Sequence, residues 1–360
     1  MKKFLMKRIW VFLLGLSVFP SFASSPDGLW KAVYVNSSPD TLLTYTKMLL
    51  RVDGGSFQLV NYDDYLAGKN LFENEGFFDL ADSSLVFNKD STNQKTYKLN
   101  IVDGNRLEII TKEDPRTVIA FVKLKRHKLG GEKDELEAFM RENPFEFDFA
   151  FFEGAFEMEF DEGSRFMVTD NVEPFFPSFS KWAVVDFDDE LFIYFSGLAP
   201  FLHVVSVDSS GIVCEDEFDR VYSASLKKVP FQQKFNKEKL FGVWEEKSVD
   251  EDYLRSMPEK LWDKEIYVKQ VWEIKEESAT LHSIFRSLDS PMEISRNGEM
   301  VQFLMFNELN NHQFRVLSID KEKLVVERLN RNGDVARDTL VKQKKMPVPV
   351  KLKDFLRDNK

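Results

Sequence analysis

Tyr97-Lys-Leu-Asn-Ile-Val-Asp103-Gly-Asn-Arg-Leu107-Glu-Ile-Ile110 is an alternating apolar and polar run, a turn that begins with Asp, and a second alternating run. Alternation with a period of two residues on both sides of a short polar turn is typical of a β-hairpin. Aspartate suits the first turn position because its carboxylate accepts hydrogen bonds from backbone N–H groups further along the turn. The stretch therefore predicts two antiparallel strands joined by an Asp-led turn.

The same hairpin occurs twice more in the chain. The two copies are Leu202-His-Val-Val-Ser-Val-Asp208-Ser-Ser-Gly-Ile212-Val-Cys-Glu215 and Phe314-Arg-Val-Leu-Ser-Ile-Asp320-Lys-Glu-Lys-Leu324-Val-Val-Glu327. A further strand with a basic end follows each one, at residues 117–126, 221–228 and 338–345. Similar hairpins precede each one, and turns recur every eight to twelve residues, as in antiparallel sheets and barrels. We predict an all-β chain of three related segments.

The first and third segments open alike, with Gly28-Leu29-Trp30 and Gly242-Val243-Trp244. Asp53-Gly54-Gly55-Ser56-Phe57 and Gly76-Phe77-Phe78 follow in the first segment. With these motifs the chain resembles the lipocalin-like domains of secreted Gram-negative bacterial proteins, which are mostly of unknown function. The resemblance implies tandem up-and-down lipocalin-like barrels or half-barrels. The Thr-Asp-Tyr motif of true lipocalins is absent.

The resemblance also implies a structural role for three aromatic residues. Trp30 and Trp244 would close one end of each outer barrel. In the middle segment, Gly154-Ala155-Phe156 puts Phe156 in the place of the tryptophan.

The segments and the stretches between them predict the domain organisation. We expect a signal peptide at 1–23, a lipocalin-like domain at 24–128, a linker helix at 129–143, a divergent acidic and Phe-rich β domain at 144–229, a second lipocalin-like domain at 230–346 and a tail at 347–360. Leu136, Phe139 and Met140 have helical spacing in the linker, and a weaker helical signal covers residues 232–241.

Residues 1–23 have the pattern of a secretory signal peptide. A basic start is followed by an apolar run of 11 residues from Ile9 to Phe19, and Ser21 and Ala23 are the small residues of a cleavage site after Ala23. Removing four positive charges changes the net charge of the chain from −11 to −15. We expect a protein in the periplasm or outside the cell, with no stable membrane anchor.

Most of this negative charge lies in residues 144–229, which hold 18 Asp and Glu, 5 Lys and Arg, and 16 of the 35 Phe residues. Phe145–Phe151 and Phe156–Phe160 alternate strictly, with Phe on one face and carboxylates on the other, as in strands between a core and water. The alternatives are an acidic face that meets a basic partner and a Ca²⁺ site built from the clusters 186–190 and 215–219, neither of which has EF-hand spacing. The acidic balance argues against a nucleic-acid partner.

One loop of the middle segment is unusually aromatic. Phe175, Phe176 and Phe179 lie in Pro174-Phe-Phe-Pro-Ser-Phe179, and Trp182 follows. The three Phe residues either pack down as a lid or stay exposed as a binding edge. These four residues are the ligand-contacting candidates.

The chain carries no recognisable catalytic or metal-binding motif. His127, His203, His282 and His312 occur singly, without a second ligand at metal-binding spacing, so we predict no metal site, no cofactor and no catalytic residues. Cys214 and His203 lie in one predicted hairpin, where a Cys–His dyad is the alternative to a buried structural thiol.

These observations favour an exported, non-enzymatic protein that binds a small apolar or aromatic-stacking ligand in an outer barrel. The first alternative is a structural or interaction module that docks a basic protein partner through its acidic middle domain. The second is an extracellular hydrolase with two convergent carboxylates.

Overall fold

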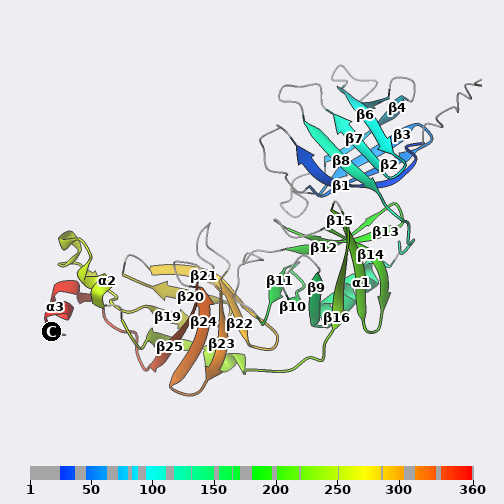
Figure 1. Cartoon of the computed structure of the whole chain (residues 1–360). Coiled ribbons are helices and arrows are strands. Elements are labelled where there is room, and N and C mark those ends of the chain that lie inside the picture. The colour runs from blue at the N-terminus through cyan, green and yellow to red at the C-terminus, as the bar shows by residue number, and fades with distance from the viewer. Residues whose placement is uncertain are drawn as a thin grey trace, which may run out of the picture.

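A computed structural model of the chain describes residues 25–36, 46–62, 72–79, 83–87, 95–110, 117–130, 132–149, 154–163, 165–170, 181–196, 201–218, 220–249, 251–284, 287–303, 313–329 and 334–358. The predicted signal peptide lies outside these residues. Strands make up 57% of the structure and helices 12%, in three antiparallel sheets with few short helices, which confirms the predicted fold class (Figure 1).

The first eight strands form a closed antiparallel barrel, the N-terminal barrel. They are β1 (Gly28–Asn36), β2 (Met48–Asp53), β3 (Ser56–Asn61), β4 (Phe72–Asp79), β5 (Ser84–Phe87), β6 (Lys95–Asp103), β7 (Arg106–Ile110) and β8 (Val118–Lys123). Each strand pairs with the next, and β8 returns to β1. Alternate side chains point inward. Trp30, Leu50, Leu107 and Phe121 are among those that form one apolar cluster inside.

The middle segment forms an open eight-stranded sheet, the middle sheet. Its strands are β9 (Phe145–Phe149), β10 (Phe156–Phe160), β11 (Phe166–Val168), β12 (Trp182–Phe187), β13 (Glu190–Phe195), β14 (Phe201–Asp208), β15 (Gly211–Phe218) and β16 (Arg220–Lys228). Its first strand pairs with its last, as in the barrel, but the ladder is interrupted between β11 and β12. Within the described residues, a single bridge between Arg165 and Lys181 crosses this seam.

A helix covers the core of the open sheet. The predicted linker helix is α1 (Lys133–Glu142), and it packs on β10 and β12. Its Leu136 and Met140 are buried in the same apolar cluster as Trp182 and the inward-facing Phe residues. Of the first alternating run, Phe145–Phe149 has the expected burial, with Phe inside and Glu146 and Asp148 exposed. In the second run, Phe156–Phe160, the prediction is wrong at Glu159, which is buried because it faces the barrel of the third segment.

The third segment forms a second closed barrel, the C-terminal barrel. Its strands are β17 (Gly242–Glu246), β19 (Val271–Ile274), β20 (Ser278–His282), β21 (Ser287–Ile294), β22 (Met300–Phe303), β23 (Gln313–Ile319), β24 (Lys323–Leu329) and β25 (Val335–Gln343). A 3₁₀ turn, η2 (Lys237–Leu240), precedes it.

An insertion between β17 and β19 and the C-terminal tail form a small lobe beside this barrel. The insertion contains α2 (Glu251–Arg255), η3 (Glu259–Leu261) and β18 (Glu265–Ile266), and the tail contains β26 (Val350–Lys351) and α3 (Leu352–Asp358). Strands β18 and β26 pair, and Leu254, Ile266 and Leu352 share an apolar cluster.

The three Asp-led hairpins are β6–β7, β14–β15 and β23–β24, and they repeat in detail. The Oδ1 atoms of Asp103, Asp208 and Asp320 accept hydrogen bonds from the backbone N–H groups of Asn105, Ser210 and Glu322, at 2.7, 2.7 and 2.8 Å. The pairing register also shifts in each first strand, at equivalent places in the second and third hairpins, Val204/Ser206 and Val316/Ser318, and two residues nearer the turn in the first, at Ile101/Asp103. Such bulges bend a strand and increase its twist, which helps a sheet to curve.

The two tryptophans occupy equivalent positions in the outer barrels. Trp30 and Trp244 are buried, and each Nε1–H donates to a carbonyl oxygen four residues earlier, of Pro26 and Leu240, at 2.7 Å. Each lies opposite a lysine of the last strand, Trp30 opposite Lys123 and Trp244 opposite Lys342. In the middle sheet the residue opposite the lysine of the last strand, Lys228, is Phe145. Phe156, which we expected in the place of the tryptophan, instead begins β10, the second strand of this sheet.

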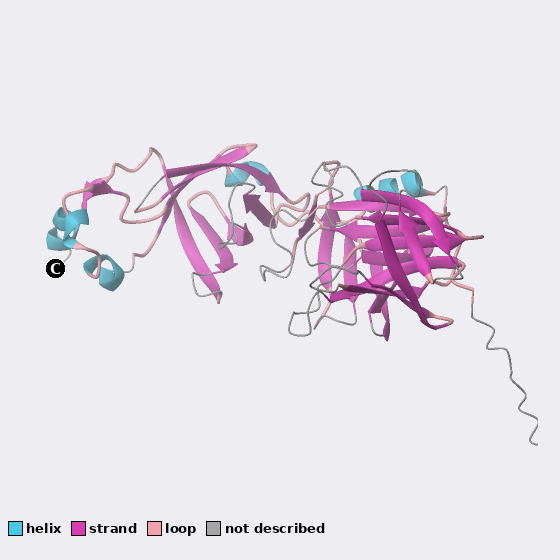
Figure 2. Cartoon of the chain, turned by 90° about the horizontal axis from the view of Figure 1, so that it is seen from above, coloured by secondary structure: helices cyan, strands magenta, loops and turns pink. Residues whose placement is uncertain are grey.

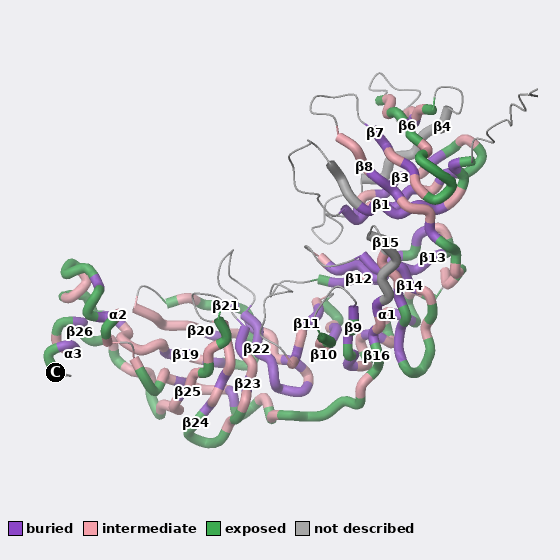
Figure 3. The backbone as a smooth tube through the Cα atoms, in the orientation of Figure 1, coloured by how far each residue is buried: buried purple, intermediate pink, exposed green. Residues whose placement is uncertain are grey.

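The three sheets follow one another in space. The N-terminal barrel stacks on the middle sheet, and the C-terminal barrel extends to one side, with the small lobe at its far end (Figures 1 and 2). Buried residues continue across the border between the N-terminal barrel and the middle sheet (Figure 3). Of the described helices, none is sufficiently long and apolar to cross a membrane.

Candidate functional site

The predicted ligand-contacting residues do not form a site in the described structure. Phe175, Phe176 and Phe179 lie outside the described residues. Trp182 is 1% exposed, and its ring meets Phe160 edge-on, with 5.0 Å between the ring centroids. Trp182 therefore packs in the core. The candidate sites lie instead at the two junctions that the middle sheet makes with the barrels.

The junction between the N-terminal barrel and the middle sheet, the N-terminal junction, has a shared apolar core. The cluster contains Leu29, Leu49, Val60, Tyr62 and Leu124 from the first segment with Val185, Phe187, Phe192, Tyr194 and Phe201 from the middle sheet. Full burial of one large apolar side chain contributes about 1.5–3 kcal/mol. A cluster of this size joins the two sheets into one packed unit.

Charged pairs surround this apolar core. Lys31 of β1 is 3% exposed and forms an ion pair with Asp216 of β15. Arg51 of β2 places its Nε 3.2 Å from an oxygen of Asp188, and Arg126 forms a second ion pair with the same carboxylate. The basic partner is in each case in the first segment and the acidic partner in the middle sheet.

Glu190 is the most buried carboxylate of the junction, with a fully buried side chain at the start of β13. Its two oxygens accept hydrogen bonds from the backbone N–H of His127 at 3.0 and 2.9 Å, and one also accepts from the N–H of Lys128 at 3.0 Å. Burial alone would raise the pKa of Glu190, but these N–H donors and His203 together lower it. The carboxylate is therefore ionised at neutral pH and fixes the linker that leaves the N-terminal barrel.

Two histidines that are 76 positions apart in the sequence meet beside Glu190. The rings of His127 and His203 lie 5.0 Å apart between centroids. His203 Nε2 is 3.1 Å from Glu190 Oε2, and His203 Nδ1 is 3.2 Å from Glu215 Oε1. His127 Nε2 is 3.3 Å from that same Glu215 oxygen. Burial lowers the pKa of His203 below its ordinary value, although the two carboxylates oppose this shift.

Cys214 lies on the other face of the same hairpin. The register pairs His203 with Glu215 and Val204 with Cys214, and neighbouring strand residues point to opposite faces. Cys214 is 1% exposed and belongs to the apolar core of the middle sheet. The structure thus places the thiol in the core and His203 at the junction, which removes the Cys–His dyad as an alternative.

We expect the Cys214 thiol to be protected in the folded protein. Burial raises its pKa far above the ordinary value, so the reactive thiolate is scarce, and reagents reach it only when the sheet opens. Reaction with a chromogenic disulfide reagent should be at least about 100-fold slower in native buffer than in denaturant. Equal rates in the two conditions would contradict the described position of Cys214.

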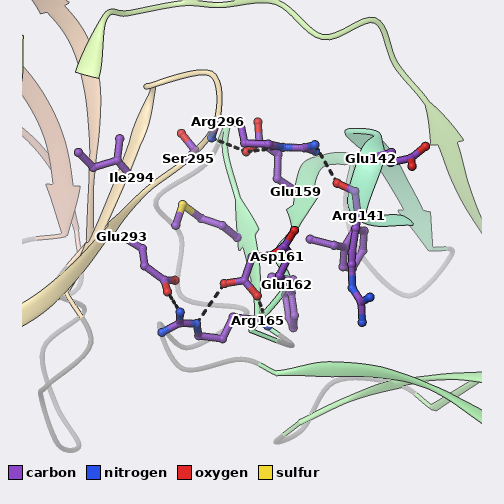
Figure 4. Close-up of a pocket in the computed structure, with 13 residues that line it drawn as sticks. Arg141, Glu142, Glu159, Asp161, Glu162, Arg165, Glu293, Ile294, Ser295 and Arg296 are labelled. Atoms are coloured by element: carbon purple, nitrogen blue, oxygen red, sulfur yellow. Dashed lines mark hydrogen bonds and ion pairs between the residues drawn. The ribbon is translucent and has the colours of Figure 1, made fainter. Parts of the chain in front are cut away.

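The junction between the middle sheet and the C-terminal barrel, the C-terminal junction, contains a pocket. Its volume is about 530 Å³, and it is open to solvent. The lining residues are Arg141, Glu142, Glu159, Phe160, Asp161, Glu162, Arg165, Phe166, Met167, Glu293, Ile294, Ser295 and Arg296. They come from α1, the β10–β11 hairpin, and the end of β21 with the turn that follows it (Figure 4).

Two charged bridges span this pocket from the middle sheet to the barrel. Arg165 binds Asp161 of its own hairpin, at 3.1 Å, and forms an ion pair with Glu293 across the junction. Glu159 accepts a hydrogen bond from the backbone N–H of Arg296 at 2.6 Å, and Arg296 Nη1 donates to the carbonyl oxygen of Arg141 at 2.8 Å. In Figure 4 these two bridges lie at opposite ends of the pocket.

Four carboxylates of the middle segment bind groups of the neighbouring segments. Asp188, Glu190 and Asp216 bind groups of the first segment, and Glu159 binds the C-terminal barrel. Asp188 and Glu190 belong to one of the two clusters weighed as a Ca²⁺ site. Arginine side chains and backbone N–H groups of the chain already bind their oxygens, and a Ca²⁺ ion needs these oxygens free as ligands.

No protein-family model matches the chain, and no curated protein matches it.

Proposed function

We propose that the chain is an exported, non-enzymatic binding protein related to the lipocalin-like domains, and that it binds a small ligand in the pocket of the C-terminal junction. The observation that carries the proposal is this pocket of about 530 Å³. Sites for small molecules are usually cavities of roughly 300–1,000 Å³, and they occur preferentially at domain interfaces. The leader at residues 1–23 is the basis for export.

The pocket is a better place for the ligand than the barrel interiors, which we expected from the sequence. Trp30 and Phe121 in one barrel, and Trp244 and Phe314 in the other, are fully buried in apolar clusters. Eight strands enclose a space that side chains of this size largely fill. We propose on this basis that side chains, rather than a ligand, occupy the barrel interiors.

The lining combines apolar surface with charges of both signs. Phe166, Met167 and Ile294 supply the apolar surface, beside three Arg and five Asp or Glu residues. Arg296 Nη2 has no hydrogen-bond partner among the described residues. An anionic group on an apolar ligand would pair with this N–H when the side chain of Arg296, which is 37% exposed, turns it toward the pocket.

The test uses anilinonaphthalene sulfonate, a fluorescent aromatic anion, with the mature chain. We expect saturable binding with one site per chain and displacement by small aromatic carboxylates. Arg296→Gln should weaken binding about tenfold or more, because a charge-assisted hydrogen bond contributes about 1.5–3 kcal/mol. Ile294→Trp, which fills the pocket, should abolish binding.

The matched control is Arg337→Gln, on a C-terminal barrel side chain that is 73% exposed and outside the pocket. It should leave the affinity unchanged. If Arg296→Gln and Ile294→Trp bind the probe as the unmodified chain does, the ligand does not occupy this pocket and the proposal is wrong.

A further inference from the structure

We propose that His127, His203 and Glu215 bind a zinc-like divalent transition-metal ion at the N-terminal junction. This site is separate from the pocket of the proposed function, which lies at the other junction. The sequence places His203 and Glu215 in one predicted hairpin, but it gives no sign that His127 joins them.

The donor atoms have the separations that a metal centre requires. His127 Nε2 and His203 Nδ1 lie 3.3 and 3.2 Å from Glu215 Oε1, and all three donor atoms lie within 4.8 Å of one another. Ligands in a tetrahedron about 2.0–2.1 Å from zinc are separated by about 3.3–3.4 Å. The two histidine–glutamate separations match this value, and a small rotation of the partly exposed His127 ring closes the third.

The hydrogen bonds around His203 leave its inner nitrogen available to a metal. Glu190 Oε2 is 3.1 Å from His203 Nε2 and is an ionised acceptor, so it fixes the hydrogen of the ring on Nε2. In the neutral ring, Nδ1 then directs a lone pair at the Glu215 carboxylate from 3.2 Å. Two acceptors that face each other are repelled, and a cation between them removes the repulsion. A histidine that binds zinc through one nitrogen usually donates its other ring N–H to a carboxylate or carbonyl, the position that Glu190 has here.

The ligand set selects the class of metal. Two imidazoles and one carboxylate suit zinc and similar first-row ions, whereas Ca²⁺ and Mg²⁺ take oxygen ligands. The side chains of His127 and Glu215 are 12% and 18% exposed, so a water molecule can reach the fourth position.

The bound ion would link two segments of the chain. His127 lies in the linker after the N-terminal barrel, and His203 and Glu215 lie on β14 and β15 of the middle sheet. Because the unfolded chain does not hold these residues together, binding would stabilise the folded junction.

The experiment uses the full mature chain, without a histidine tag, after treatment with a chelator. Zn²⁺ alone is titrated by calorimetry, and Co²⁺ alone is followed by its visible absorption, which is intense in tetrahedral sites. We expect one ion per chain, a tetrahedral Co²⁺ spectrum that Zn²⁺ abolishes, and a higher Tm with Zn²⁺ than with Mg²⁺ or Ca²⁺.

His127→Gln is the main variant, because His127 is partly exposed and its loss leaves the core intact. Its affinity for Zn²⁺ should fall by more than about 100-fold. This exceeds the usual effect of removing a residue that only forms a hydrogen bond to a metal ligand. His282→Gln, in the C-terminal barrel, removes a histidine outside the cluster and should bind as the unmodified chain does.

Two results would overturn the proposal. The first is the absence of stoichiometric Zn²⁺ binding, and the second is unchanged Zn²⁺ affinity in His127→Gln.

Discussion

Replacing Glu190 by alanine is expected to lower the free energy of unfolding of the N-terminal barrel and middle sheet by about 3–5 kcal/mol. The substitution leaves the backbone N–H groups of His127 and Lys128 and the Nε2–H of His203 without their shared acceptor. Each such donor costs about 1–3 kcal/mol when it is buried. Calorimetry should record a fall in Tm of roughly 6–20 °C for this unit.

The matched control for Glu190→Ala is Glu146→Ala in the same sheet. The Glu146 side chain is 47% exposed and lies 4.0 Å from Lys227, which is also exposed, so its loss should cost less than about 1 kcal/mol. The transition of the C-terminal barrel should be unchanged in both variants. Equal Tm values for the two variants would contradict the central role of Glu190 in the junction.

The repeated hairpins could be predicted because their information is local. Alternation over four to eight residues determines which face is buried, and an Asp that caps its own turn determines where the strand reverses. Asp103, Asp208 and Asp320 do this at the predicted positions. The same local pattern says nothing of where a sheet closes, and the seam between β11 and β12 was not predictable from it.

Phe156 shows that an opening motif can be present in the sequence although its strand is not the first strand of the sheet. Gly154-Ala155-Phe156 has the spacing of the opening motif, yet an earlier strand, Phe145–Phe149, pairs with the last strand of the sheet. Only the pairing identifies Phe145 as the residue opposite Lys228, and pairing between residues about 80 positions apart leaves no local signal.

The histidine cluster could be predicted in part. Once His203 and Glu215 are assigned to one hairpin, the alternation places both on the face opposite Cys214. His127 is different, because it lies in a linker without periodicity, and its position depends on how the N-terminal barrel packs on the middle sheet. Tertiary packing, rather than spacing in the sequence, brings the third donor to the site.

Which groups the carboxylates of the middle segment bind is likewise determined by tertiary structure. The composition shows that the middle segment is acidic. That this acidity binds an external basic partner stays a hypothesis. In the described structure, Lys31, Arg51 and Arg126 of the first segment bind carboxylates of the middle sheet. These local ion pairs, rather than an overall charge difference between the segments, therefore contribute to how the chain packs on itself.

Trp244 is the residue on which we expect the C-terminal barrel to depend most. Its side chain is fully buried, its Nε1–H donates to the Leu240 carbonyl oxygen at 2.7 Å, and the Lys342 ammonium lies 4.9 Å from its ring centre. These contacts join η2, which precedes the barrel, to β17 and to the last strand, β25.

Trp244→Ala should therefore lower the free energy of unfolding of the C-terminal barrel by about 3–5 kcal/mol, because it leaves a cavity and an unpaired carbonyl. Calorimetry should show that its transition falls by more than about 10 °C while the transition of the N-terminal unit stays in place. Phe231→Ala is the control, because this aromatic side chain is 51% exposed and its loss should cost less than about 0.5 kcal/mol. If Trp244→Ala and Phe231→Ala unfold at the same temperature, the tryptophan does not stabilise the closed barrel as its contacts indicate.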